Sequence, residues 1–226
     1  MKAARNLLSA SLMSLFLVQA QPANAASTAD ILANAPTLQI LIDSSSSSPA
    51  TSQAFMDNVA PLVVEKLKTM PMATQVIVTA VGDSVRVPEM KRTRILARNA
   101  PDGGPVEDVA RKVGAYLRNF PKALVGNEHG SSHLIGGIFD AAKNVNPKSQ
   151  ANQIVIISDL VEYSDVTDCT KKCVLPKPNF QLPGTEVTAY GVGLGLPSGL
   201  EMRVNNEWQR YLTAAGAKPV VLRRTF

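Results

Sequence analysis

The sequence predicts an α/β protein in which a mainly parallel sheet lies between two layers of helices. Short apolar runs rich in β-branched residues alternate with longer stretches whose apolar residues recur at helical spacing. The apolar runs lack the polar alternation of a half-exposed strand, which favours strands buried on both faces. We therefore expect a three-layer α/β/α sandwich.

The N-terminus has the layout of a secretory signal peptide. Lys2 and Arg5 precede an apolar stretch, Leu7–Val18, and the small-residue triplet Ala23-Asn24-Ala25 follows. A membrane anchor is the alternative, but a span needs roughly 20 apolar residues, more than this stretch has. We expect residues 1–25 to be removed, residues 26–36 to form a flexible leader, and the product to be periplasmic or secreted.

The remaining residues, 37–226, suit a single domain by length. Removing Lys2 and Arg5 lowers the formal charge from +5 to +3. The clusters Lys91–Arg94 and Arg223–Arg224 lack interleaved aromatic residues, so we do not expect nucleic-acid binding. No later apolar segment is long enough to cross a bilayer, and the cleaved product is therefore not expected to span a membrane.

The expected elements follow one another as strand and helix. The predicted strands are Thr37–Ile42, Gln75–Val81, Gln153–Ser158, Glu186–Val192 and Pro219–Leu222. The predicted helices are Ser52–Met70, Val106–Asn119, Ser132–Asn144 and Gly199–Ala215, and the last carries Trp208 on its packing face.

Three further segments are expected to be less regular. An edge strand near Val85–Val87 extends towards Ile95, because Pro88 and the charged residues suit an edge. Asn99–Gly104 reads as a turn. Val161–Pro183, with two cysteines and three prolines, predicts a loop long enough to be functional.

Oxygen-bearing side chains follow the first predicted strand at alternate positions. Asp43, Ser45 and Ser47 form the pattern Asp-x-Ser-x-Ser, and the carboxyl ends of strands are where open α/β sheets bind ligands. Ser132 opens a predicted helix, and Asp159 ends the third long strand. One or two carboxylates with several hydroxyls are hard oxygen ligands of the kind that Mg²⁺ and Ca²⁺ prefer.

These residues resemble the von Willebrand factor A (vWA) domain with its metal-ion-dependent adhesion site. The resemblance extends from Leu38 to about Leu222 and includes "QIVIISDL" and "VTAYGVGLG". It implies a Rossmann-like sandwich and a site for Mg²⁺, or Ca²⁺ or Mn²⁺, held by five residues: Asp43, Ser45, Ser47, Ser132 and Asp159. Ser132 replaces the usual threonine, with Ser131 as the alternative in the register, and Leu160 stands where glycine is common.

The resemblance also implies a function in binding rather than turnover. In such domains the cation keeps a position open for a carboxylate of a partner protein. We expect cation-dependent protein–protein interaction in an envelope, secretion or conjugation assembly of an exported bacterial protein. The alternative is a metal-free structural subunit with a degenerate site.

A linker and an enzyme are the remaining interpretations of the serine run. Five consecutive serines are often a linker, but a linker would not need Asp43 between a buried strand and a helix. A phosphoryl-transfer hydrolase would want a second aspartate where Ser45 stands, and Gly195–Gly199 lacks the spacing of a serine-hydrolase elbow. We therefore expect no enzymatic activity and assign no catalytic residue.

The two cysteines, Cys169 and Cys173, are most simply a local disulfide in an oxidising compartment. The two histidines, His129 and His133, are four residues apart, the same spacing as the two cysteines, so a zinc site with these four ligands is a second possibility. Free thiols are a third.

Overall fold

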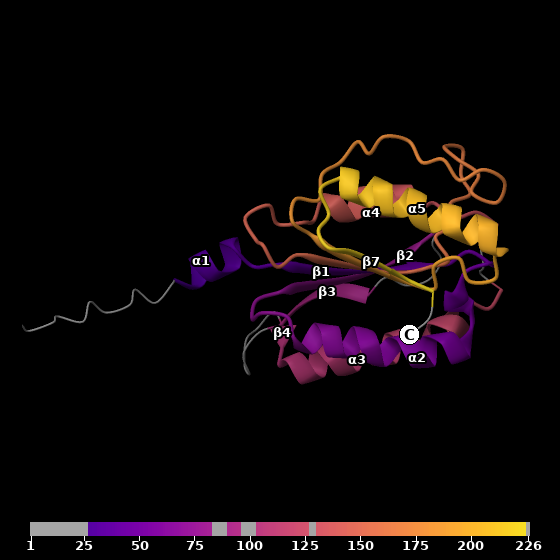
Figure 1. Cartoon of the computed structure of the whole chain (residues 1–226). Helices are drawn as coiled ribbons and strands as arrows, with labels where there is room; N and C mark the ends of the chain where they lie inside the picture. The colour runs from indigo at the N-terminus through magenta and orange to yellow at the C-terminus, as the bar shows by residue number, and fades with distance from the viewer. Residues whose placement is uncertain (1–26, 83–89, 96–102, 127–129, 225–226) are drawn as a thin grey trace, which may run out of the picture.

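The computed structural model describes residues 27–82, 90–95, 103–126 and 130–224 (Figure 1). The predicted signal peptide and the predicted strand at Val85–Val87 lie outside these residues, as does His129. The described residues form one sheet with helices on both faces, which confirms the predicted α/β fold class. In the described part of the chain, no helix is both long enough and apolar enough to cross a membrane.

Seven strands form the sheet in the order β4-β3-β2-β1-β5-β6-β7. All neighbours run parallel except β2 and β3, which are antiparallel. The strands are β1 (Thr37–Asp43), β2 (Gln75–Val81), β3 (Met90–Ile95), β4 (Gly103–Gly104), β5 (Gln153–Ile157), β6 (Glu186–Tyr190) and β7 (Val220–Arg223). Every residue of the central strand β1 is buried, including the polar Gln39, whose amide donates a hydrogen bond to the Ala141 carbonyl at 2.6 Å.

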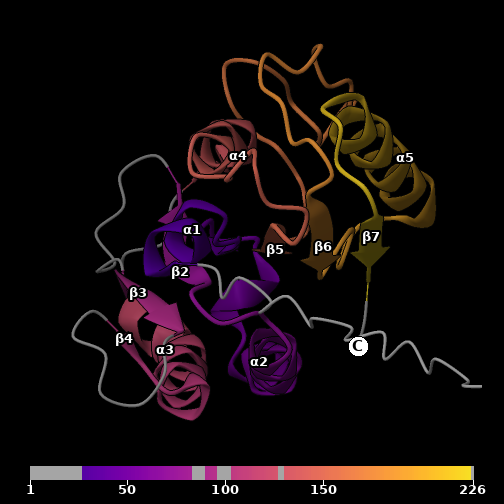
Figure 2. The same cartoon turned by 90° about the vertical axis from the view of Figure 1, so that its left-hand side faces the viewer.

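Two pairs of helices cover the sheet (Figures 1 and 2). Helices α2 (Gln53–Lys68) and α3 (Val106–Leu124) lie on one face, and α4 (Leu134–Ala142) and α5 (Ser198–Ala214) lie on the other. The Ser52 hydroxyl begins α2 by accepting a hydrogen bond from the Phe55 N–H at 3.3 Å. The buried residues of α2 recur at helical spacing, so one stripe of the helix faces the sheet.

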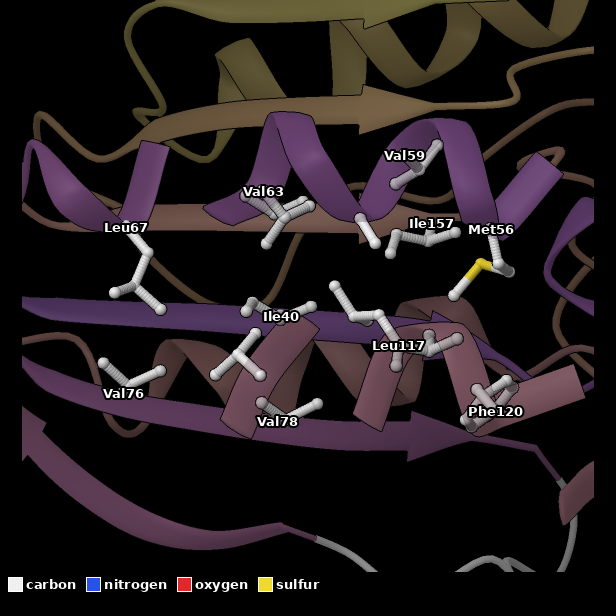
Figure 3. Packing of buried hydrophobic residues seen from close by; sticks show 14 of the residues in the cluster. Ile40, Met56, Val59, Val63, Leu67, Val76, Val78, Leu117, Phe120 and Ile157 are labelled. Carbon is white, nitrogen blue, oxygen red and sulfur yellow. The ribbon is translucent and has the colours of Figure 1, made fainter. Parts of the chain in front are cut away.

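The core consists of two layers, one on each side of the sheet. Figure 3 shows the layer under α2 and α3, where Val59 and Val63 of α2 and Leu117 of α3 pack with Ile40 of β1 and Ile157 of β5. The opposite layer joins α4 and α5 to the other sheet face and contains Trp208, which is fully buried. The packing role predicted for Trp208 is therefore confirmed.

The helix boundaries differ from the prediction where tertiary contacts intervene. Helix α3 continues past Asn119 to Leu124 because Phe120 and Leu124 extend the buried stripe. Helix α4 begins at Leu134 because Ser132 is held in an extended bridge to Tyr163.

The segments expected to be irregular contain more structure than predicted. The leader includes a short helix α1 (Thr28–Ala33), which Ser27 and Asp30 begin with a reciprocal capping box. The Asn146 amide donates hydrogen bonds to the carbonyls of Ala33 and Ala35, so the leader is attached to the domain. The predicted turn ends in β4, which pairs with β3 on its outer side, so β3 is not the edge strand that was expected.

Residues 161–183, all of which are described, form the long loop that the sequence predicts.

The order of the strands reverses at β1, since β2 lies on one side of it and β5 on the other. A crevice at such a switch point opens at the carboxyl ends of the strands. Asp43 ends β1 and Asp159 follows β5, so both acidic residues lie at this edge of the sheet.

Candidate functional site

Asp43 lies at the bottom of the crevice and is fully buried. Its carboxylate accepts hydrogen bonds from the Ser45 backbone N–H at 2.9 Å, the Ser158 hydroxyl at 2.7 Å and the Ser132 hydroxyl at 3.3 Å. Burial raises the pKa of the Asp43 carboxyl, and these hydrogen bonds oppose the shift. The carboxylate therefore accepts hydrogen bonds from one N–H group and two hydroxyls, which come from three loops.

The serines that follow Asp43 occupy different environments. The Ser44 hydroxyl donates to the Val81 carbonyl at 2.8 Å and joins the loop to β2. The Ser45 hydroxyl lies near enough to Asp43 to lower the pKa of that carboxyl. Nevertheless, Ser45 Oγ is buried and makes no hydrogen bond of normal geometry with any described residue. A buried hydroxyl without a partner costs free energy, so Ser45 is suited to a ligand that supplies the missing contact.

The last three serines of the run, Ser46, Ser47 and Ser48, also differ from one another in environment. Ser46 and Ser47 are exposed, and the Ser47 hydroxyl lowers the pKa of Asp159 by hydrogen bonding. Ser48 is buried, and its hydroxyl accepts a hydrogen bond from the Ala50 N–H at the start of a short 3-10 helix, Pro49–Thr51. Five chemically identical residues therefore have at least three roles, which excludes a uniform linker.

Ser132, rather than Ser131, faces Asp43. The backbone N–H and carbonyl of Ser132 both bond to Tyr163 at 3.2 Å, and this bridge turns the buried Ser132 hydroxyl into the crevice. Ser131 lines a separate cleft together with His133 and Ser164. The bridge decides between the two registers that the sequence leaves open.

Asp159 is the second buried carboxylate of the crevice. Burial and the negative charge of Asp43 raise the pKa of Asp159 from 3.8 to about 7. The Val161 N–H, bonded at 2.9 Å, and the Ser47 and Ser158 hydroxyls act in the opposite direction. Two carboxyls whose ionised forms repel each other form a site that is stabilised by a bound cation or by a proton.

Leu160 adopts the backbone conformation for which glycine is suited. Its φ of 59° lies in the left-handed region, while its side chain is fully buried. The Trp208 indole N–H donates to the Leu160 carbonyl at 2.7 Å, and the Leu160 N–H donates to the Ser158 hydroxyl at 2.9 Å. Side-chain burial and these bonds hold the loop that directs Asp159 into the crevice.

Two buried polar residues beside the crevice were not predicted from the sequence. Ser158 connects the acidic pair, because its hydroxyl donates to Asp43 and also lowers the pKa of Asp159. Glu162 is buried and accepts the Ile135 N–H at 3.1 Å, which ties the loop after β5 to the first turn of α4. Burial raises the pKa of Glu162. The sequence signal for Ser158 is its place beside Asp159 at the strand end.

The crevice opens to solvent through a cleft of about 330 Å³. Its lining comes from the serine run, from the loop before α4 and from the long loop: Ser45, Ser46, Ser47, Gly130, Ser132, Val161, Tyr163, Asp168, Thr170 and Lys171. Three of the proposed ligands, Ser45, Ser47 and Ser132, line this cleft, and the long loop provides one of its walls.

The donor set of the crevice consists of two carboxylates and several hydroxyls. Within the described ranges, no group of three or more His, Cys, Asp or Glu side chains is placed to hold a metal ion. Cys169 and Cys173 form a disulfide with an S–S distance of 2.05 Å, so the alternatives with zinc or with free thiols are not supported. The predicted ligands Asp43, Ser45, Ser47, Ser132 and Asp159 do converge on the crevice, and a cation there would be held mostly by neutral oxygens.

No protein-family model matches this chain, and no curated protein sequence does. Among solved structures, 35 chains match. One crystal form of proximal thread matrix protein 1 from the mussel byssus is 15% identical over 84% of this chain and 44% of that protein, with a TM-score of 0.46.

Two of the other matches are metal-bound proteins. The same mussel protein with a zinc-occupied MIDAS motif is 13% identical over 86% of this chain and 42% of that protein, with a TM-score of 0.42. The manganese-loaded TRAP protein of Plasmodium vivax is 9% identical over 80% of this chain and 72% of that protein, with a TM-score of 0.40. This chain spans less than half of the mussel protein. With identities and TM-scores this low, we assign the site from the residues of this chain.

Proposed function

We propose that this chain is an exported vWA-like domain that recognises a protein partner across a divalent cation. Asp43, Ser45, Ser47, Ser132 and Asp159 would hold the ion. Bound there, the ion would supply positive charge between two buried carboxyls and a coordination position for a carboxylate of the partner.

The unpartnered Ser45 hydroxyl is the observation that carries the proposal. It is buried beside Asp43, with no hydrogen-bond partner among the described residues. Most buried side-chain hydroxyls have a hydrogen-bond partner, and among the unpaired buried atoms of the described residues only Ser45 Oγ follows a buried carboxylate at the crevice. A cation shared by Asp43 and Asp159 satisfies this oxygen and also offsets the burial and the repulsion by Asp43 that raise the pKa of Asp159.

The donor chemistry favours hard cations. Carboxylate and hydroxyl oxygens suit Mg²⁺, Ca²⁺ and Mn²⁺ better than the softer ions that thiolates select. The residues of the chain would bind and orient the ion, and the cleft beside Ser45 and Ser47 leaves it accessible to a partner.

Binding rather than hydrolysis is supported by the position of Asp43. Its carboxylate is fully buried and accepts three hydrogen bonds, so it is poorly placed to attack a substrate. A periplasmic or secreted location is supported by the predicted signal peptide and suits the Cys169–Cys173 disulfide. An envelope, secretion or conjugation assembly is the proposed setting.

A metal-free structural subunit is the second candidate, and one observation favours it. A pKa of about 7 at Asp159 means that a proton can neutralise this carboxyl near neutral pH. The same crevice is then stable without a cation, and its hydrogen bonds become internal supports of the fold.

Thermal unfolding with magnesium, calcium or manganese separates the two candidates. A cation at about 100 times its Kd should stabilise the wild type by roughly 2.7 kcal/mol. Asp43→Ala should lose this response, and Ser45→Ala should reduce it. Ser44→Ala is the matched control: it removes the hydrogen bond to Val81 and lowers the stability of the apo protein, but it should retain the cation response.

The outcomes are distinct for the two candidates. A cation response in the wild type and in Ser44→Ala that is weak in Ser45→Ala supports the metal site. No response in the wild type, or equal responses in all four proteins, would leave the structural subunit as the function.

A further inference from the structure

The long loop builds one wall of the crevice, and this wall is rigidly attached to the domain. We define the wall segment as Asp168–Cys173. The disulfide closes it, and both cysteines are buried in the core layer of α4 and α5. The Cys169 N–H donates to the Glu162 carbonyl at 2.8 Å, and the Lys171 and Lys172 N–H groups donate to the Asp168 carbonyl at 3.3 and 3.1 Å.

Tyr163 connects the wall segment to the floor of the crevice. Its backbone bridges Ser132 on one side and Asp168 on the other. Ser132 faces Asp43, so the wall and the proposed cation ligands are placed by one set of backbone hydrogen bonds. The position of the wall relative to the ion is therefore determined by the fold and needs no partner to form.

An aromatic ring and an ammonium group line the cleft at its exposed rim, Tyr163 from the bridge to Ser132 and Lys171 from the wall segment. Tyr163 is 48% exposed, and the Lys171 side chain is 84% exposed. Asp168 contacts the Thr170 N–H and hydroxyl through Oδ1, and its Oδ2 lies 3.1 Å from Lys171 Nζ. The lysine is held over the cleft by an exposed ion pair, which is weak enough to be exchanged for another carboxylate.

We propose that the wall segment selects the partner: it favours an acidic polypeptide segment with two carboxylates, one for the cation and one for Lys171. Tyr163 packs against the segment between these two contacts, as exposed tyrosines do at interaction surfaces. Charge complementarity identifies this occupant, because Lys171 lies on the same cleft as the cation ligands. This inference rests on the proposed function and adds the class of partner and the residues that choose it.

The test uses short peptides that carry a trifluoroacetyl group at the N-terminus and an amide at the C-terminus. Their binding to the protein is measured by fluorine NMR in saturating magnesium. One peptide carries a single aspartate among glycines. Others add a glutamate, or a lysine instead, one, two or three residues after the aspartate. The proteins are the wild type, Lys171→Glu, Lys172→Glu, Tyr163→Ala and Asp43→Ala. Lys172→Glu is the matched control, since it makes the same charge change at an exposed neighbour that does not line the cleft.

The wild type should bind the best peptide with two acids about two- to fivefold more tightly than the peptide with one, as expected for an exposed ion pair. Lys171→Glu should reverse this preference in favour of the lysine peptide, and Lys172→Glu should retain the preference of the wild type. Tyr163→Ala should weaken every peptide. The magnesium-induced thermal shift should be unchanged in these three variants, which shows that the cation site is intact.

Failure of the inference is distinguishable from failure of the proposed function. Magnesium-dependent binding that shows no preference for a second acid, or no reversal in Lys171→Glu, overturns the role of the wall and leaves the cation site in place. Binding that is absent from the wild type, or is independent of magnesium and of Asp43, overturns the proposed function together with the inference.

Discussion

Replacing Asp159 by asparagine should change how the stability of the apo protein depends on pH. Asparagine has nearly the same shape and its amide oxygen can accept the Val161 N–H, but it has no charge. The folded state raises the pKa of Asp159 from 3.8 to about 7, so the protonated carboxyl is favoured by folding. Its contribution to stability is present below pH 3.8 and is lost as the pH rises through about 7.

The magnitude follows from the same shift. One pKa unit corresponds to about 1.4 kcal/mol, so the change from 3.8 to about 7 is worth roughly 4 kcal/mol. The wild type without cations should therefore lose roughly this free energy of unfolding between pH 4 and pH 8, relative to Asp159→Asn. At pH 8 the variant should be the more stable of the two apo proteins. Added magnesium should stabilise the wild type at pH 8 and have little effect on the variant.

The assay is urea unfolding at pH 4, 6 and 8, in chelator and in magnesium. Asp140→Asn is the control, because Asp140 is an exposed carboxylate of α4 paired with Lys143. Its stability should follow the wild type at every pH. If the wild type and Asp159→Asn keep a constant difference in free energy from pH 4 to pH 8, the burial and repulsion inferred at Asp159 are refuted.

Two further changes test the loop after β5. Leu160→Gly should be less destabilising than Leu160→Ala by about 1 kcal/mol in urea unfolding, because both lose the buried side chain and only glycine relieves the left-handed φ of 59°; a more stable alanine variant would contradict this. Replacing Cys169 and Cys173 together by serine should lower stability by about 2 kcal/mol, the chain-entropy value for so short a ring. Intact mass after alkylation checks the bond, and labelling of both thiols in native, non-reduced protein would exclude it.

Local pattern was sufficient to predict most of the architecture. The apolar runs of β1, β2, β5 and β6 are rich in β-branched residues, so the local sequence alone predicted that these strands are buried on both faces. Each of the four main helices was predicted from a single stripe of apolar residues at helical spacing. The helix end that differs most from the prediction, at Leu124 instead of Asn119, depends on contacts with other elements rather than on helix propensity.

The sequence also indicated which residues gather in the crevice. Asp43 and Asp159 end strands that are adjacent and parallel, so both acidic residues had to lie at the same edge of the sheet. The alternation of Ser45 and Ser47 after Asp43 is a local property of the loop. The left-handed conformation of Leu160 was not predicted from the sequence, since leucine rarely adopts it.

Tertiary structure alone decided how these groups interact. Ser132 and Ser158 donate to Asp43 across 89 and 115 residues of chain, and the bridge to Tyr163 determines which serine of the pair 131–132 turns inward. A shift of one residue in that bridge would exchange the two hydroxyls, and no local preference distinguishes one serine from the next. The pKa of Asp159 has the same origin, because burial and the charge of Asp43 arise only when distant loops meet. The sequence therefore determined the elements and the candidate ligands, and packing decided their directions and their charges.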